Sequence, residues 1–216
     1  MKIKRYFFTN LGIALCIALS IILLSEKGFF KRIELASSDI FFRLRKSLPV
    51  NKHIVVIEID DSNIASIGRW PWKRSWHAAM TRALHTFGAR YIFFDIIFSE
   101  KSSEQEDLLF GEAIKEAGNV YLPFVSQEND LRAKPLMLNP LREFKPYLSG
   151  TGSINITPDI DGILREVPLF THVPGRIKVH MALRLALDSL QMNIQKFENN
   201  FLVIGNAQAS KKIPLT

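Results

Sequence analysis

Three aspartates each follow or interrupt an apolar run that has the composition of a β-strand. Asp60 and Asp61 close the run that begins at Ile54, and Asp95 lies within a second run. In open α/β sheets the carboxyl ends of parallel strands form the edge where ligands bind, so these carboxylates are candidates for holding a divalent cation or a cationic ligand. The residue types favour a structural role, with a turn or helix cap at Asp61 and an ion pair between Asp95 and Arg74.

A loop rich in tryptophan follows the first aspartates. Trp70 and Trp72 flank a proline, Arg74 comes two residues later, and His77 lies one turn into the helix predicted next. Burial of two indoles contributes several kcal/mol, at about 25 cal/mol per Å² of apolar area. The loop is either a hydrophobic plug over the sheet edge, which we favour, or an aromatic wall of a ligand pocket in which Arg74 binds a charged group. His77 has no second histidine or cysteine nearby, which argues against a zinc site.

A second polar stretch contains Asn155, Asp159, Asp161, Gly162 and Arg165. Its Asp-x-Asp-Gly run resembles the start of a calcium loop, but the glutamate that ends such a loop is missing at its offset. We therefore predict a tight turn, with the arginine tied back to a carboxylate. Phosphate-binding glycine loops, nucleophile elbows and paired zinc-binding histidines are also missing from the sequence, so we predict no catalytic residue, metal or cofactor.

The elements that would position these residues alternate between strands and helices. Strands are predicted at residues 54–60, 91–98, 120–125 and 201–204, with shorter ones near 154 and at 167–170, and helices at 75–87, 107–117 and 180–191. One face of the helix at 75–87 carries Trp76, Ala79, Met80, Ala83, Leu84 and Phe87. The order strand, helix, strand predicts parallel pairing, and hence an α/β fold with a mostly parallel sheet and flanking helices.

An apolar run at residues 6–24 precedes this fold. Its 19 residues contain no ionisable group except a tyrosine hydroxyl, and as a helix they would span about 28 Å, close to the thickness of a bilayer core. Lys2, Lys4 and Arg5 precede the run, as they would in a cleaved signal peptide. The length of the run and the lack of a small-x-small exit favour an uncleaved transmembrane helix. The positive-inside rule then places residues after about 25 outside the cytoplasm.

An amphipathic helix is predicted at residues 29–48, ended by Pro49. It either packs on the following domain or forms a stalk that pairs with a second copy. The predicted organisation is a cytoplasmic leader at 1–5, a transmembrane helix at 6–24, a juxtamembrane amphipathic helix at 25–50 and an extracytoplasmic domain at 51–216.

Charge is concentrated next to the apolar run. Residues 1–50 carry nine basic and three acidic side chains, or +6 of the net +7, which leaves 19 basic and 18 acidic side chains, or +1, for the other 166 residues. The domain therefore lacks the basic face that phosphate backbones require, and we exclude a nucleic-acid partner. The single cysteine, Cys16, excludes an intrachain disulfide.

Several motifs in a fixed order resemble the CHASE type 2 domain over roughly residues 30–216. They are Asp39-x-x-Phe42-x-Leu44-Arg45, the strand into Asp60-Asp61-Ser62, Gly68-x-Trp70-Pro71-Trp72-x-Arg74-x-x-His77-Ala78, Gly88-Ala89, Phe94-Asp95-x-x-Phe98, Gly152-x-x-Asn155 and Asp159-x-Asp161-Gly162-x-x-Arg165. The resemblance implies a sensory module that follows the first membrane helix of a bacterial receptor. In that family the cytoplasmic output is an adenylate or guanylate cyclase, a histidine kinase or a serine/threonine kinase.

The sequence ends at Thr216 without a returning membrane helix or an output domain, so we expect a receptor fragment, apparently without the domain's final portion, or an accessory subunit. The expected location is the bacterial inner membrane, and the expected partners are the membrane, a small-molecule or protein stimulus and a second copy. Two other hypotheses stay open. One is a membrane-tethered metal-dependent hydrolase that uses Asp60, Asp61 and Asp95, and the other is a structural envelope protein that docks a partner.

Overall fold

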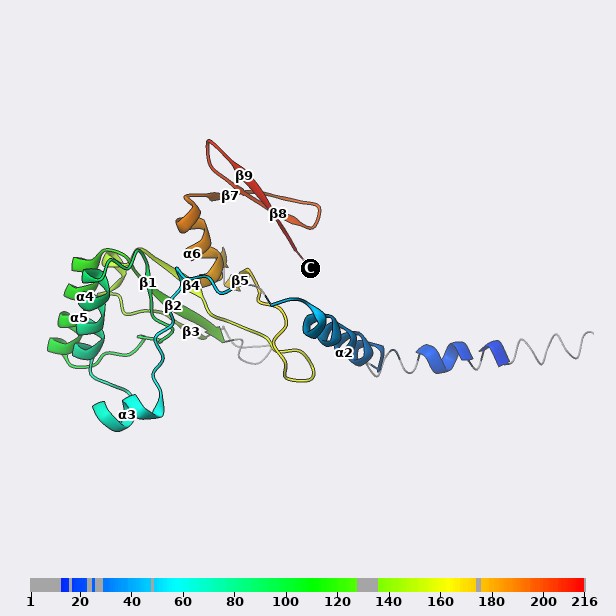
Figure 1. The fold of residues 1–216 in the computed structure, drawn as a ribbon, viewed down its shortest axis with the longest axis horizontal. Coiled ribbons are helices and arrows are strands. Elements are labelled where there is room, and N and C mark those ends of the chain that lie inside the picture. Colours follow the sequence, from blue (N-terminus) through cyan, green and yellow to red (C-terminus); the bar gives the residue numbers. More distant parts are fainter. Residues whose placement is uncertain are drawn as a thin grey trace, which may run out of the picture. The chain divides into compact units, whose positions relative to one another are not determined.

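The computed structural model in Figure 1 describes residues 13–15, 17–22, 25, 29–47, 49–127, 136–173 and 176–215. The chain divides into two compact units, Met1–Ile59 and Asp60–Thr216. The predicted membrane helix at residues 6–24 lies partly outside the described residues, and its stretches at 13–15 and 17–22 are helical. No helix in the described part of the chain is both long and apolar enough to cross a bilayer.

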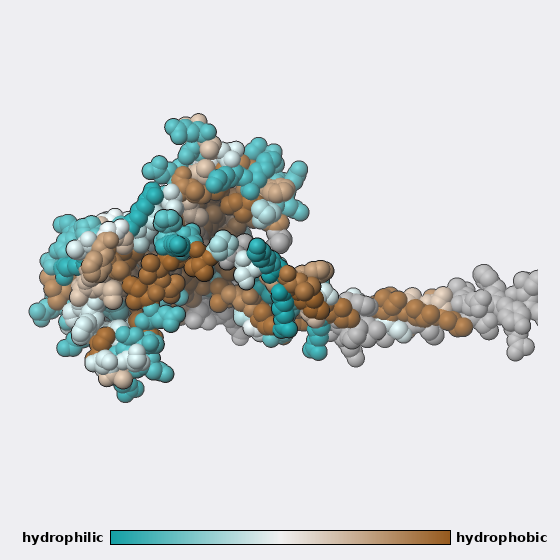
Figure 2. All heavy atoms as spheres, in the orientation of Figure 1, coloured by the Kyte–Doolittle hydropathy of each residue, from teal (hydrophilic) through white to brown (hydrophobic). Residues whose placement is uncertain are grey.

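Helix α2 (Phe29–Leu44) in the first unit confirms the helix predicted after the apolar run, although it ends four residues earlier than predicted. Figure 2 shows apolar side chains on the surface of this helix. The exposed apolar residues are Ile33, Ile40, Phe41, Phe42 and Leu44. Both predicted roles of this helix, packing on the domain and pairing with a second copy, would bury these side chains.

Residues 54–60 do not form the predicted strand. Ile54, Val55 and Val56 are 68%, 79% and 75% exposed. Among the described residues, the backbone N–H groups from Val55 to Ile59 have no hydrogen-bond partner. β-Branched residues favour an extended backbone, but a strand forms only where a neighbouring strand supplies the hydrogen bonds. The prediction was wrong because composition reports the preference of the side chains and not the presence of a partner.

The second unit contains a four-stranded sheet. Strands β1 (Ile92–Phe93), β2 (Val120–Gln127) and β4 (Gly150–Ser153) are parallel, with β2 between the other two, while β3 (Leu136–Leu138) is antiparallel to β2. The α/β class is confirmed, but the sheets are mixed and not mostly parallel. Only eight residues separate β2 from β3, too few for the crossover that a parallel pair requires.

Strand β1 is shorter than the predicted strand at 91–98, and β2 gives the reason. Ile92 N–H donates to Asn119 O and Phe94 N–H donates to Tyr121 O, in steps of two residues. The next donor from β2 toward β1 would be residue 123, which is a proline without an N–H group. The ladder therefore stops, and the chain leaves the sheet after two paired residues.

Helices α4 (Arg74–Thr86) and α5 (Glu104–Ala117) lie side by side, as Figure 1 shows. They run parallel, because Ser75 near the start of α4 contacts Glu106 near the start of α5, and Arg82 near the end of α4 contacts Glu116 near the end of α5. Helix α5 begins three residues before its predicted start. Ser103 caps it by accepting the N–H of Glu106, and Gly118 ends it in the left-handed conformation.

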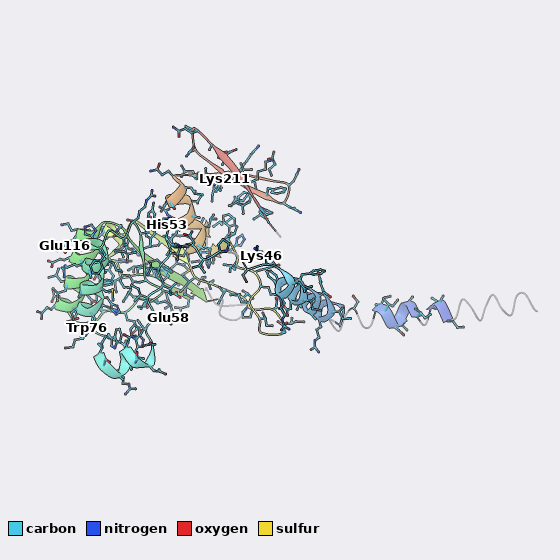
Figure 3. The ribbon with its side chains drawn as sticks, viewed as in Figure 1. Lys46, His53, Glu58, Trp76, Glu116 and Lys211 are labelled. Carbon is cyan, nitrogen blue, oxygen red and sulfur yellow. The ribbon has the colours of Figure 1, made fainter. Side chains whose placement is uncertain are left out.

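The apolar face of α4 is not its buried face. Trp76 and Met80 are 51% and 40% exposed, whereas His77, Ala78 and Thr81 are buried. Figure 3 labels Trp76 toward one end of the helix pair and Glu116 toward the other. The contacts that α4 makes are the ion pairs of Arg74 and Arg82 with α5 and the packing of His77 on Phe98.

The C-terminal half of the second unit has its own core. A short 3-10 turn (η1, Lys145–Tyr147) precedes β4, and the hairpin β5 (Phe170–Val173) and β6 (Arg176–Val179) leads into helix α6 (Met181–Leu190). An antiparallel sheet of β7 (Asn193–Glu198), β8 (Phe201–Gly205) and β9 (Ser210–Pro214) follows. Its core residues include Leu183, Leu187, Met192, Leu202 and Ile204. This half therefore packs α6 against strands β7 to β9.

Candidate functional site

The carboxylate of Asp60 caps helix α3 (Asp61–Ile67). Its Oδ1 atom accepts the N–H of Asn63 at 2.8 Å, the Oγ–H of Ser62 at 2.8 Å and the side-chain amide of Asn63. The backbone hydrogen bond from Asn63 is the main reason why the pKa of Asp60 lies below its usual value. The predicted cap is thus present one residue earlier than expected, at Asp60 rather than at Asp61, which lies in the first turn.

Arg74 does not form the predicted ion pair with Asp95. Its Nε atom lies 3.4 Å from Asp107 Oδ1, and its Nη2 atom donates to Glu100 O at 3.0 Å. Its guanidinium lies 4.5 Å from the centre of the Phe98 ring. Because α4 and α5 are parallel, the acidic first turn of α5 lies beside the start of α4 and takes the arginine, while Asp95 is exposed.

Glu106 acts on the start of α4 from the neighbouring helix. Lys73, the residue at the cap position of α4, makes no capping side-chain bond. Glu106 Oε2 instead accepts the N–H of Ser75 at 2.7 Å, which lowers the pKa of Glu106. A free N–H group of the first helical turn is therefore satisfied by a residue 31 positions further along the chain.

The tryptophan loop, residues 68–73, rests on His77. Trp70 lies 5.6 Å from Trp72 and 5.9 Å from His77 between ring centres, and Trp72 Nε1–H donates to Gly68 O at 2.7 Å. In the part of the chain that the structure describes, the ring contacts of both indoles reach the core through His77 alone. The loop thus contacts the ring cluster through Trp70, and the plug over the sheet edge stays a prediction.

His77 itself is only 5% exposed. Its ring centre lies 5.9, 5.1 and 5.9 Å from those of Phe94, Phe98 and Phe110. Burial, and to a smaller extent the nearby cation of Arg74, lower the pKa of His77 from 6.5 to about 4. The imidazole is therefore neutral at pH 7 and lies among aromatic rings.

Asn155 continues the pairing of β2 and β4 with its side chain. Ser126 N–H donates to Asn155 Oδ1 at 2.9 Å, and Asn155 Nδ2 donates to Ser126 O at 2.6 Å. The Oγ–H of Ser153 donates to the same Oδ1 at 2.8 Å. The amide thus replaces a backbone partner at the carboxyl edge of the sheet.

Replacement of Asn155 by alanine is expected to lower the free energy of unfolding by about 2 kcal/mol, because the buried N–H and C=O of Ser126 both lose their partner. Urea unfolding followed by circular dichroism measures the change. The matched control is Asn139→Ala, which removes a single 3.4 Å bond to Met137 O and should cost less than about 0.5 kcal/mol. Equal values for the two variants would contradict this role.

Arg165 binds both aspartates of its loop, as predicted. Its Nη1 atom lies 2.8 Å from Asp159 Oδ2, and its Nη2 atom lies 2.8 Å from Asp161 Oδ2. Gly162 has a φ of +80°, and its N–H donates to Asp159 O at 2.8 Å, which closes the predicted tight turn. The two aspartates, the arginine and the glycine of the turn therefore hold one another through these bonds.

Replacement of Arg165 by glutamine is expected to raise the pKa of Asp161 from about 2 toward its usual 3.8, because the hydrogen bond from Arg165 is the main cause of the shift. A depressed carboxyl pKa adds stability above 3.8, which is lost as the pH falls toward 2. NMR titration of the carboxyl carbon measures the shift. Arg184→Gln, which removes a different ion pair, should leave it unchanged, and an unchanged value in Arg165→Gln would refute the assignment.

No group of three or more histidine, cysteine, aspartate or glutamate side chains in the described residues is arranged to hold a metal ion. A hollow of about 320 Å³ lies at the turn between β7 and β8, lined by Phe197, Glu198, Asn199, Asn200, Phe201 and Leu215. None of the predicted site residues lines it. The predicted residues instead fall into separate groups: a helix cap, an aromatic cluster under the tryptophan loop, a sheet-edge amide and an arginine turn.

Sequence reasoning missed Glu106, Asp107 and the aromatic partners of His77. Ser103-x-x-Glu106 is a capping-box pattern that would have placed the start of α5 correctly. No local pattern points to the bond from Ser75 to Glu106, since the two residues meet only when the helices dock.

The fold is a mixed α/β domain, and its polar clusters are contacts within the domain. The chain belongs to the CHASE2 domain family, whose model matches residues 14–216. The resemblance predicted from the motifs is thereby confirmed over nearly the whole chain, and CHASE2 domains are sensory, non-catalytic modules of signalling receptors. Comparison with curated proteins finds no significant match, and comparison with solved structures finds none either.

Proposed function

We propose that the chain is the extracytoplasmic sensory module of a bacterial inner-membrane receptor and that it regulates a cytoplasmic signalling output, a cyclase or a protein kinase. The observation that carries the proposal is the family match over residues 14–216. The apolar run at residues 6–24 with its basic leader supports an N-terminal anchor that leaves the rest outside the cytoplasm.

The candidate site residues make internal contacts and are not assembled around one reaction centre. Asp60 caps a helix and Arg74 pairs with Asp107, so both are committed to internal contacts. A hydrolase built on Asp60, Asp61 and Asp95 would need these carboxylates to converge on a metal ion, and no specific observation favours that alternative.

The location is tested by fusing alkaline phosphatase, which is active only outside the cytoplasm, to Thr216 of the full chain. We expect active phosphatase in the membrane fraction, and a fusion to a fluorescent protein that matures only in the cytosol should stay dark. The reverse pattern would overturn the proposed location. The regulatory role is tested by deleting residues 60–216 from the receptor that carries the module, and an output that ignores the deletion would overturn it.

A further inference from the structure

The link between the tryptophan loop and the core is a titratable residue. Trp72 contacts Trp70, Trp70 contacts His77, and the other three faces of the His77 cluster are phenylalanine rings that belong to the core. Phe98 and Phe110 are fully buried. The imidazole therefore occupies a position where an uncharged ring fits and an imidazolium ion does not.

Several titratable or charged groups lie on the elements packed against His77. They are Arg74, Arg82 and His85 on the same helix, Glu104, Glu106, Asp107, Glu112, Lys115 and Glu116 on α5, Asp95 between Phe94 and Phe98, and Arg69 and Lys73 in the loop. Arg82 and Glu116 pair with each other. Asp107 and Glu106 are bound to Arg74 and to Ser75 N–H, and Asp95 is exposed. Burial and the Arg74 cation alone act on His77, and both oppose its protonation. No described carboxylate is placed to stabilise a charge on this ring.

We propose that acid is the stimulus that this module detects and that His77 is the group that binds the proton. A proton on His77 places a cation among apolar rings and beside Arg74, so the protonated ring is stable only when it leaves the cluster for water. Because Trp70 packs against this ring in an edge-to-face contact, the tryptophan loop is released with it. The proposal rests on the proposed sensory function and adds to it the nature of the stimulus.

The size of the effect follows from the difference in proton affinity between the closed and open states. In the closed state His77 has a pKa of about 4, and in water its value is 6.5, a difference of about 2.5. A nearly tenfold change in the ratio of open to closed molecules accompanies each pH unit between these values, so the ratio rises by about 100-fold from pH 7 to pH 4. Above pH 6.5 the acid dependence vanishes because neither state binds the proton.

The released loop lies next in sequence to helix α3, which carries no buried residue. Residues 45–60 connect α3 to helix α2, which follows the apolar run. A change in the tryptophan loop thus occurs close in sequence to the segment that precedes the domain. In an anchored receptor, a signal must pass from the domain to that segment.

The test uses the purified full chain, whose three tryptophans are Trp70, Trp72 and Trp76. Tryptophan emission and acrylamide quenching are followed from pH 7.5 to pH 4, with far-ultraviolet circular dichroism on the same samples. We expect a red shift and stronger quenching with a midpoint between pH 6.5 and 4, at unchanged secondary structure. In His77→Phe, which keeps an aromatic ring without a titratable nitrogen, the transition should be lost.

The matched control is His180→Asn. His180 also has a pKa lowered by burial, and it caps α6 by accepting the N–H of Ala182, a role that asparagine retains. This variant should keep the transition. If His77→Phe does not fold, NMR titration of the His77 ring in the unaltered chain replaces it, with an apparent pKa between 4 and 6.5 that matches the fluorescence midpoint as the expected result.

Three results would overturn the proposal: no transition down to pH 4, a transition that persists in His77→Phe, or a loss of secondary structure at the same midpoint. These results are distinct from a failure of the proposed function. If the loop responds to acid but receptor output ignores deletion of the module, the sensory function fails and the proton switch stands. If output depends on the module but the loop ignores acid, only the switch fails.

Discussion

Replacement of Phe110 by alanine is expected to lower the free energy of unfolding by about 3–5 kcal/mol, the cost of emptying a large, fully enclosed aromatic site. Phe110 is 0% exposed, and its ring centre lies 4.9 and 5.2 Å from those of Phe98 and Phe144. Its ring contacts both the ring cluster around His77 and the buried ring of Phe144. Its loss therefore removes packing on both sides of the cluster.

Urea unfolding of the full chain measures this loss, and Leu108→Ala is its control. Leu108 lies on the same helix but is 61% exposed, so its truncation should change the free energy of unfolding by less than about 0.5 kcal/mol. A cost below about 1.5 kcal/mol for Phe110→Ala would show that the cluster is not the centre of the core.

Replacement of Gly152 by alanine is expected to lower the free energy of unfolding by about 3 kcal/mol, because the added methyl group has no room. A Cβ atom at Gly152 would lie 2.5 Å from Met181 Cα and 2.8 Å from Met181 N. These are backbone atoms at the start of α6, and they cannot move aside as the end of a side chain can. The start of α6 must shift away from β4 and carry its contacts with it.

Gly111→Ala is the control for this variant. Its added Cβ would lie 3.6 Å from the Phe144 ring, an ordinary contact, and alanine is a better helix former than glycine. Thermal and urea unfolding should show no loss, and up to about 1 kcal/mol of gain, for Gly111→Ala. Similar losses for the two variants would argue against a close approach of α6 to β4.

Sequence patterns predicted the elements that carry their own signals. Strand β2, the end of α5 at Gly118 and helix α6 all fall close to the predicted bounds, because local composition, caps and a stop signal agree there. Residues 54–60 and the buried face of α4 were predicted wrongly. In both cases the outcome depends on what the element packs against, and a periodic pattern contains no information on that.

The same distinction applies to the candidate site. The bond from Arg165 to Asp161 spans four residues and was predicted from the turn itself. The pairing of Arg74 with Asp107 spans 33 residues and follows from the parallel docking of two helices. His77 was predicted as a member of a ligand-binding or structural motif and as a poor metal ligand, and its burial by phenylalanines at 94, 98 and 110 became visible only in the folded chain.

The capping of α4 by Glu106 has a consequence for the order of assembly. Helix α4 has no capping side chain of its own, and the carboxylate that serves it is made 31 residues later in synthesis. When the α4 segment is free to fold but the α5 segment is not, the first turn of α4 lacks its capping partner. Isolated helices of this length are marginally stable in water. The two helices are expected to form together, in one step, only after the segment that contains Glu106 is free to fold.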